Sequence, residues 1–228
     1  MTDAPEVPVI AVDGPSGVGK GTLARALVQR LHWHYLESGA LYRALGLLAE
    51  RRGVALDDAR GLAQLAAGLE LLFADGAVWL DGEELGDSIR TEAAGRRASQ
   101  IAPLPAVRAA LLRWQRRCAR PPGLVADGRD MGSVVFPSAA CKIFLTASAE
   151  ARAMRRFKQL REKGFNVNIA RLLRDIRERD WRDSKRSVSP LKRAGDAFEL
   201  DTTGLSADEV MAVVFKRVEQ TWPLLKRG

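Results

Sequence analysis

The chain has 228 residues, of which 46% are hydrophobic, and its 36 Lys and Arg against 28 Asp and Glu give a formal net charge of +8. A chain of this length and apolar content folds as one enlarged domain or two small ones with a substantial core, so an intrinsically disordered protein is excluded. A membrane-spanning protein is also excluded, because no apolar stretch approaches the roughly 20 residues that cross a bilayer.

The first predicted elements are a strand, a loop and a helix. Residues 9–13 are apolar and rich in β-branched side chains, and glycines follow at once, so this run predicts a strand. In the helix that follows, Leu23, Leu27 and Leu31 recur at i, i+4 spacing and form a buried stripe.

The next elements are a helix and an antiparallel insertion. Residues 41–51 predict the helix, with Ser38 as its N-cap, because a hydroxyl satisfies an amide left unpaired at a helix start. Residues 69–90 break the helical pattern, since two Asp-Gly pairs separate short apolar runs. Such pairs favour tight hairpin turns, so we expect an antiparallel meander or hairpin inserted into the fold.

The second half of the chain alternates buried strands with helices. Strands are predicted over residues 123–127, 141–146 and 197–201. Helix-forming residues on both sides of a Gly-containing turn predict a helical hairpin over 150–190, and a capping box at 206–209 begins the last helix. Strands that alternate with helices indicate a parallel sheet covered on both faces.

The positive charge is unevenly distributed. Residues 150–193 hold 15 basic and 6 acidic side chains, whereas the rest of the chain holds 21 basic and 22 acidic ones. A basic segment indicates either a solvated helical surface or a site for an anionic partner, including a nucleic acid. Composition alone leaves these alternatives open.

The strand, loop and helix at the amino terminus carry a phosphate-binding motif. The pattern is G-x-x-x-x-G-K, whose glycines let backbone amides point at phosphate oxygens while the lysine reaches the β and γ phosphates. The residues predicted to bind the nucleotide are Gly14, Pro15, Ser16, Gly17, Val18, Gly19, Lys20, Gly21 and Thr22.

The metal ligand of this motif is displaced. Gly21 stands where the common motif has the Ser or Thr that binds Mg²⁺, and Thr22 comes one position later. Thr22 therefore contacts a phosphate with Mg²⁺ held mainly through water, or another acid organises the metal. Asp127 closes an apolar strand and is a candidate to orient magnesium-bound water.

Four segments carry a family resemblance. They are G-P-S-G-V-G-K-G-T at 14–22, E-S-G-A-L-Y-R at 37–43, D-G-R-D-M-G at 127–132 and R-D-W-R-D-S-K-R at 179–186. Together they resemble the bacterial cytidylate kinases, and the similarity runs nearly from end to end. The resemblance implies an α/β P-loop kinase with a five-stranded parallel sheet between helices, an inserted antiparallel substrate-binding subdomain and a helical lid.

The resemblance also implies a division of the chain. We expect a single P-loop kinase unit whose core comprises residues 7–65, 104–150 and 194–228. The insertion that binds the nucleoside monophosphate is expected at about 66–103, and the lid at about 155–192.

The expected reaction is the transfer of the γ-phosphoryl group of ATP to CMP or dCMP, with Mg²⁺. Phosphoryl transfer depends on positioning and on neutralising charge, which suits Lys and the bidentate guanidinium of Arg. By resemblance the catalytic residues are Lys20, Arg129, Arg179 and Arg186.

The resemblance assigns the substrate side residue by residue. Arg43, Arg129 and Arg186 match positions that hold the acceptor phosphate, and Arg179 and Asp183 match contacts made when the lid closes. The residues that match groups facing cytosine are Ser99, Arg108 and Asp130, and Ser38 and Tyr42 complete the predicted substrate set. A carboxylate suits the cytosine N4 amine, which is a donor.

Two alternatives are carried alongside this hypothesis. One is a P-loop kinase for UMP or a small polar metabolite, and the other is a nucleic-acid-binding protein that uses the basic segment at 150–193. The preferred hypothesis expects CMP, dCMP and ATP as partners, no nucleic acid, no membrane and a monomer. The amino terminus lacks the pattern of a secretory signal and Cys118 and Cys141 form no C-x-x-C, so we expect a cytoplasmic location.

Overall fold

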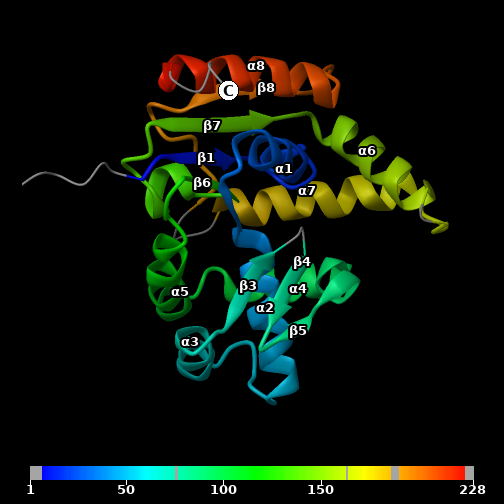
Figure 1. Ribbon diagram of the computed structural model, residues 1–228. Coiled ribbons are helices and arrows are strands. Elements are labelled where there is room, and N and C mark those ends of the chain that lie inside the picture. Colours follow the sequence, from blue (N-terminus) through cyan, green and yellow to red (C-terminus); the bar gives the residue numbers. More distant parts are fainter. Residues whose placement is uncertain (1–6, 75–76, 163, 186–189, 224–228) are drawn as a thin grey trace, which may run out of the picture.

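The computed structural model describes residues 7–74, 77–162, 164–185 and 190–223. Its centre is a parallel sheet of five strands in the order β2-β6-β1-β7-β8 (Figure 1). The strands are β1 (Val9–Asp13), β2 (His34–Glu37), β6 (Leu124–Gly128), β7 (Cys141–Thr146) and β8 (Phe198–Asp201). The predicted α/β class and five-stranded parallel sheet are confirmed.

Both faces of the sheet are covered, as its apolar strands require. On one face, Ile10 and Val12 of β1 pack with α1 (Lys20–Leu31) and α8 (Ala207–Thr221). On the other face, Val9 and Ala11 pack with the π-helical turn Met131–Val135 and with side chains of α5 (Pro105–Arg117) and the residues that follow it. Successive residues of β1 therefore face opposite helical layers.

The insertion forms a separate layer beside the sheet. Its strands β3 (Leu71–Ala74), β4 (Ala77–Leu80) and β5 (Glu83–Glu84) form an antiparallel meander, as predicted. Asp81 and Gly82 both have positive φ, as the second Asp-Gly turn requires. A second apolar core lies between these strands and the helices that precede and follow them in the chain (Figure 1). These elements are α2 (Ser38–Arg51), α3 (Ala59–Ala67), the 3₁₀ helix Gly86–Arg90, α4 (Glu92–Ile101) and α5.

The predicted helical hairpin consists of α6 (Ala149–Glu162) and α7 (Ile169–Lys185). Figure 1 shows α7 running beneath the sheet, between the sheet and the insertion. Leu172, Leu173 and Ile176 form an apolar stripe on α7 that is only half-buried, and Ile169 at the start of the helix is 38% exposed. The fully buried side chain on α7 is Asp183, at 1% exposure. Polar contacts therefore hold much of this helix.

Two predictions about individual elements were wrong or incomplete. Ser38 is not an N-cap, because α2 begins at Ser38 itself and Glu37 precedes it in extended conformation. Strand β2 was absent from the predicted elements, because it is only four residues long and α2 follows it directly. In α8 the predicted capping box of Ser206 and Glu209 is confirmed.

A helix that crosses a bilayer must be apolar and about 20 residues long. In the described part of the chain, no helix meets that requirement.

Candidate active site

The glycine-rich segment joins the carboxyl end of β1 to α1 and forms a tight loop. Gly14, Gly17 and Gly19 have φ values of 146°, 76° and 101°, which residues with side chains rarely adopt. A side chain at Gly14 is barred by sterics as well, because a Cβ would lie 2.2 Å from the carbonyl oxygen of Leu145. Backbone amides and a helix amino terminus thus meet at one place, the arrangement that binds phosphate.

Lys20 is the first residue of α1 and its side chain is buried in the cleft. Its Nζ donates a hydrogen bond of 2.8 Å to the carbonyl oxygen of Pro15, within the loop. Burial lowers the pKa of Lys20 to about 7, and the positive charge of Arg129 acts in the same direction. An anion bound here would favour the charged form.

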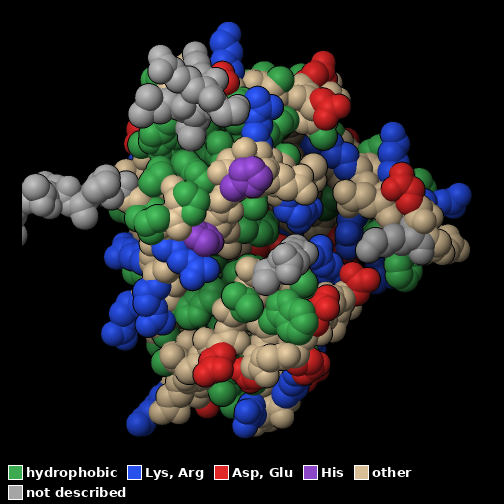
Figure 2. All heavy atoms as spheres, in the orientation of Figure 1, with side chains coloured by type: hydrophobic (Ala, Val, Ile, Leu, Met, Phe, Trp, Pro, Cys, Tyr) green, Lys and Arg blue, Asp and Glu red, His purple; other side chains and the backbone are tan. Residues whose placement is uncertain are grey.

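Three arginines converge on Lys20 from different elements. Arg43 comes from α2, Arg129 from the segment after β6, and Arg179 from α7. Burial lowers the pKa of Arg179 to about 10, followed by the charge of Arg129, and burial also lowers the pKa of Arg43. The Nε atom of Arg179 is buried and has no hydrogen-bond partner among the described residues. Figure 2 shows Lys and Arg side chains lining the hollow between the hairpin and the rest of the molecule.

One carboxylate ties this cationic cluster to α7. The Nε of Arg129 donates a hydrogen bond of 3.0 Å to Oδ2 of Asp183, whose side chain is almost fully buried. The segment after β6 and the last turns of α7 are thereby joined. Four converging cations with a buried unpartnered guanidinium nitrogen form a site for a polyanion such as a phosphate chain.

A second polar group lies on the insertion side of the cleft. Arg108 of α5 forms an ion pair with Asp130, and both side chains are largely buried. Nη1 of Arg108 also donates to the hydroxyl of Tyr42 at 3.3 Å and to the carbonyl oxygen of Ala102 at 3.4 Å. Ser99 of α4 lines the same space. Carboxylate, guanidinium and hydroxyl groups are therefore presented together, as recognition of a nucleobase edge requires.

A cavity of about 160 Å³ brings these groups together. Its lining includes Ser16, Gly17 and Lys20 of the loop, and Asp127. It also includes every predicted substrate-side residue except Arg186, which lies outside the described residues: Ser38, Tyr42, Arg43, Ser99, Arg108, Arg129, Asp130, Arg179 and Asp183. Side chains that are far apart in the sequence thus face one cavity.

The residues around Asp127 fit a magnesium ion held largely by phosphate and water. Burial raises the pKa of Asp127 to about 6, and the hydroxyl of Tyr35 donates to its Oδ2 at 3.4 Å. Glu37 lies near enough to raise that pKa further. The described residues contain no group of three or more potential ligands, and Mg²⁺ commonly takes one or two carboxylates plus phosphate oxygens.

Gly21, at the end of the phosphate-binding motif, leaves space beside the carboxylate of Asp127. A Cβ at Gly21 would lie 3.5 Å from Oδ2 of Asp127, so the position of the usual Ser or Thr ligand directly adjoins Asp127. Thr22 is exposed on α1. Asp127 is therefore better placed than Thr22 to organise a metal.

The sequence interpretation missed a buried contact between the hairpin and the loop. Arg152 of α6 is 4% exposed and donates from Nη1 to the carbonyl oxygen of Ser16 at 3.1 Å. The same guanidinium binds both carboxylate oxygens of Asp180 on α7, at 2.9 and 2.5 Å. Arg152 lies among other basic residues on a helix, so nothing in its spacing distinguished it from a solvated face.

A second missed contact concerns Ser38. The side chain of Gln115 on α5 is buried and donates from Nε2 to Oγ of Ser38 at 3.2 Å. The hydroxyl hydrogen of Ser38 is then available to the cavity. A lone Gln within an amphipathic helix gives no signal of this role.

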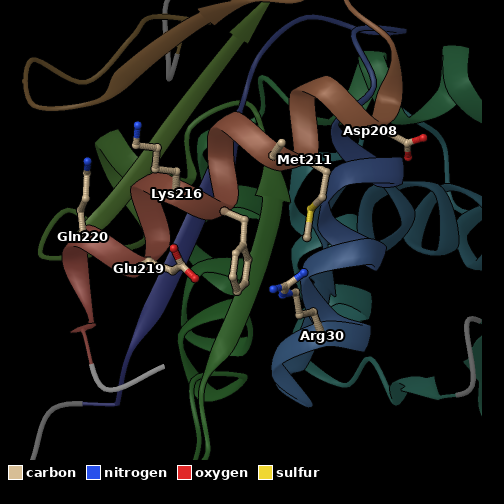
Figure 3. A pocket seen from close by; sticks show the side chains of 8 residues that line it. Arg30, Asp208, Met211, Lys216, Glu219 and Gln220 are labelled. Carbon is tan, nitrogen blue, oxygen red and sulfur yellow. The ribbon is translucent and has the colours of Figure 1, made fainter. Parts of the chain in front are cut away.

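A larger hollow lies elsewhere on the molecule. It measures about 560 Å³ and lies between α1 and α8, where the guanidinium of Arg30 stacks 3.7 Å from the ring centroid of Phe215 (Figure 3). Arg30 lies ten residues along α1 from Lys20, about 15 Å at 1.5 Å per residue. This hollow is therefore separate from the phosphate loop.

Comparisons with known proteins bear on the whole chain. The family described as cytidylate kinase matches residues 10–220. The chain is 56% identical to the cytidylate kinase of Chromobacterium violaceum, over 94% of this chain and 96% of that protein. It is 55% identical to the cytidylate kinase of Pseudomonas aeruginosa strain LESB58, over 95% and 97% of the two chains.

Among solved structures, an uncharacterised protein from Eubacterium ventriosum matches with a TM-score of 0.51 and 12% identity. The match covers 94% of this chain and 99% of that one. At this identity the similarity concerns the fold alone.

Proposed function

Because the chain belongs to the cytidylate kinase family, we propose that it transfers the γ-phosphoryl group of ATP to CMP and dCMP, forming ADP with CDP or dCDP. The observation that carries this proposal is the cavity itself. It combines a phosphate loop, converging cations that include the unpartnered Nε of Arg179, and a polar Arg108–Asp130 pair at the far side.

The donor triphosphate binds at the loop. The backbone amides of residues 14–22 surround its β and γ phosphates, and the amino terminus of α1 adds a partial positive charge. Lys20 leaves the carbonyl oxygen of Pro15 and donates to the phosphates, whose charge restores its protonated form.

The acceptor phosphate binds opposite the donor. Arg43 and Arg129 hold it, and Arg179 reaches both it and the transferred group. Arg186, which lies outside the described residues, is assigned the same role by the resemblance alone. Guanidinium groups remain charged and bind phosphate oxygens with paired hydrogen bonds, so they neutralise the negative charge on the equatorial oxygens.

The nucleoside of the acceptor extends toward the insertion. Ser38, Tyr42 and Asp183 contact the sugar or its phosphate, and Ser99 and Arg108 face the O2 and N3 edge of the base. Asp130 accepts a hydrogen bond from the N4 amine of cytosine. Uracil has an oxygen at that position and would face the carboxylate with an acceptor, which a site of this kind rejects.

Asp127 and Glu37 would hold Mg²⁺, through water and the phosphate oxygens of ATP. Bound there, the ion would supply positive charge that offsets the negative charge on the transferred phosphoryl group.

The chemical step requires little covalent help from the protein. An oxygen of the acceptor phosphate forms a bond to the γ phosphorus as the bond to the bridging oxygen of ADP breaks. The arginines and Lys20 hold the two phosphates in line, and closure of the hairpin over the site excludes water, which would otherwise hydrolyse ATP.

The same proposal assigns a role to each part of the chain. The core at 7–65, 104–150 and 194–228 carries the donor site, the insertion at about 66–103 contributes to the base site, and the lid at about 155–192 closes over both nucleotides. We propose that the enzyme acts as a cytoplasmic monomer on free nucleotides, with no nucleic-acid or membrane partner.

Product analysis tests the proposed function. Purified protein is incubated with ATP, MgCl₂ and either CMP or dCMP, and the nucleotides are separated by anion-exchange chromatography. We expect ADP and the pyrimidine diphosphate in equal amounts. Lys20→Met should lower the rate by at least about a hundredfold with an unchanged circular dichroism spectrum. The control Lys216→Met, on the exposed face of α8, should have the same rate as the parent protein. Formation of ADP and inorganic phosphate without CDP would contradict the proposal.

A further inference from the structure

We infer that Asp13 is a positioning residue that fixes the segment carrying Arg129 and Asp130 and thereby controls selection of the acceptor base. The inference rests on the proposed function and adds to it a residue that does not itself line the cavity.

The carboxylate of Asp13 binds two consecutive backbone amides. Asp13 is the last residue of β1 and is 5% exposed. Its Oδ1 accepts a hydrogen bond of 2.8 Å from the amide of Met131, and its Oδ2 accepts one of 2.8 Å from the amide of Gly132. Both oxygens of one side chain are therefore used to hold the start of the π-helical turn.

These amides follow Arg129 and Asp130 directly in the chain. On the other side of those residues, Gly128 is held in the sheet opposite Asp13 by the pairing of β1 with β6. Asp13 thus anchors both ends of the segment between Gly128 and Met131, one end through strand pairing and the other through its carboxylate. If the carboxylate contact is lost, one anchor remains and the two side chains can shift.

The segment between Gly128 and Gly132 is closely packed, so a shift at one of its residues also moves the neighbouring residues. A Cβ at Gly128 would lie 2.8 Å from the side chain of Met131, and a Cβ at Gly132 would lie 3.2 Å from that of Lys142 and 3.5 Å from Oδ2 of Asp13. The backbone therefore approaches its neighbours as closely as glycine permits. A change at Asp13 is transmitted to Asp130, which faces the base site beside Arg108.

The charged form of the Asp13 carboxylate is costly to bury. Burial raises the pKa of Asp13 to about 6, and the negative charge of Asp130 acts in the same direction, against the two backbone hydrogen bonds and Lys20. A buried charged group that lowers the stability of the fold is expected at a position that serves function.

Asp13→Asn tests the inference, because it keeps the shape but turns one acceptor oxygen into a donor that faces an amide N–H. We expect kcat/KM for CMP to fall by about ten- to hundredfold and the ratio of kcat/KM for CMP to that for UMP to fall severalfold. The KM for ATP should change by less than about twofold. Asp58→Asn is the matched control, since Asp58 accepts from the amide of Gly61 at the start of α3, away from the cavity.

An unchanged CMP-to-UMP ratio in a folded Asp13→Asn protein would overturn the inference and leave Asp13 a purely structural residue. If that variant does not fold, Gly132→Ala provides the second test, because its Cβ would lie 3.2 Å from the Lys142 side chain and 3.5 Å from Oδ2 of Asp13, and so crowds the same segment without removing the carboxylate. It should lower the ratio in the same direction, and an unchanged ratio would again overturn the inference. Failure of the parent to phosphorylate CMP would instead refute the proposed function.

Discussion

At the scale of single residues, the cleft contains charged groups that the fold buries without fully neutralising. Lys20, Asp127 and Arg179 have pKa values shifted toward their neutral forms, with burial as the largest cause in each case. In the absence of ligand such groups lower stability, since the charged form loses its hydration. Bound nucleotides supply the missing counter-charges, which couples ligand binding to stability.

The raised pKa of Asp13 makes a prediction about pH. Its pKa rises from 3.8 to about 6 on folding, so between these values the folded state binds more protons than the unfolded state. The stability that this group contributes is present below pH 3.8 and is lost as the pH rises through 6. Relative to Asp13→Asn, the free energy of unfolding of the parent should therefore fall by about 2–3 kcal/mol between pH 4 and pH 8.

Urea denaturation of the nucleotide-free proteins at a series of pH values measures this difference. The hydrogen bond lost in Asp13→Asn lowers the free energy of unfolding by the same amount at every pH. The change with pH in the difference between the two proteins therefore reports the titration of Asp13 alone. A difference that is flat between pH 4 and 8 would show that Asp13 has an ordinary pKa in the folded protein.

The sequence predicted the roles of some single residues well and of others not at all. Lys20 and the loop glycines were predictable because their spacing follows from how backbone amides surround phosphate. Arg152, Gln115 and Asp13 were not, because their roles depend on partners more than 75 residues away in the chain. Local pattern carries no information about such contacts.

At the scale of elements, the α6–α7 hairpin is the least firmly packed part of the site. The apolar stripe of α7 is half-buried, and the helix is held by the ion pairs Arg129–Asp183 and Arg152–Asp180. Few buried apolar contacts and several polar ones are typical of segments that open and close. Arg152 also contacts the phosphate loop, so movement of α7 and the state of the loop are linked.

Asp180→Asn tests that link. The substitution removes the charge that faces Arg152 and leaves its guanidinium bound mainly to backbone carbonyl oxygens. We expect faster amide hydrogen exchange throughout residues 169–185, at least about threefold, and a lower kcat/KM for ATP. Asp175→Asn, an exposed carboxylate on the same helix, is the control. Equal exchange in Asp180→Asn and the parent would show that the ion pair does not hold α7.

The elements themselves were largely predictable. Strands with β-branched residues, the Asp-Gly turn at 81–82 and the capping box of α8 each follow from local chemistry, and the structure has all three. The other Asp-Gly pair, at 75–76, lies outside the described residues. The start of α2 and the depth of burial of α7 were not predictable in this way. The hydroxyl of Ser38 is used by Gln115, and the face of α7 is set by Asp183, so tertiary contacts decide both.

At the scale of the whole molecule, three parts meet at one cavity. The sheet with its loop supplies Lys20, the helices beside the insertion supply Arg43 and Arg108, and the hairpin supplies Arg179. The formal charge of +8 is concentrated in residues 150–193, and Arg179 carries part of it into the cleft. In this account the basic segment serves the phosphates of two nucleotides rather than a nucleic acid.

We propose that this cavity selects a cytosine nucleotide as the phosphoryl acceptor. Steady-state kcat/KM values of the parent enzyme for CMP, dCMP, UMP and AMP, at saturating ATP and Mg²⁺, test it most directly. The value for CMP or dCMP should exceed that for UMP by at least about tenfold, because cytosine offers Asp130 an amine where uracil has an oxygen. The value for AMP should be lower by a similar factor, because adenine, although it has an amine, is a larger purine that does not fit a site built for a pyrimidine. Turnover of UMP that equals or exceeds that of CMP and dCMP would contradict it.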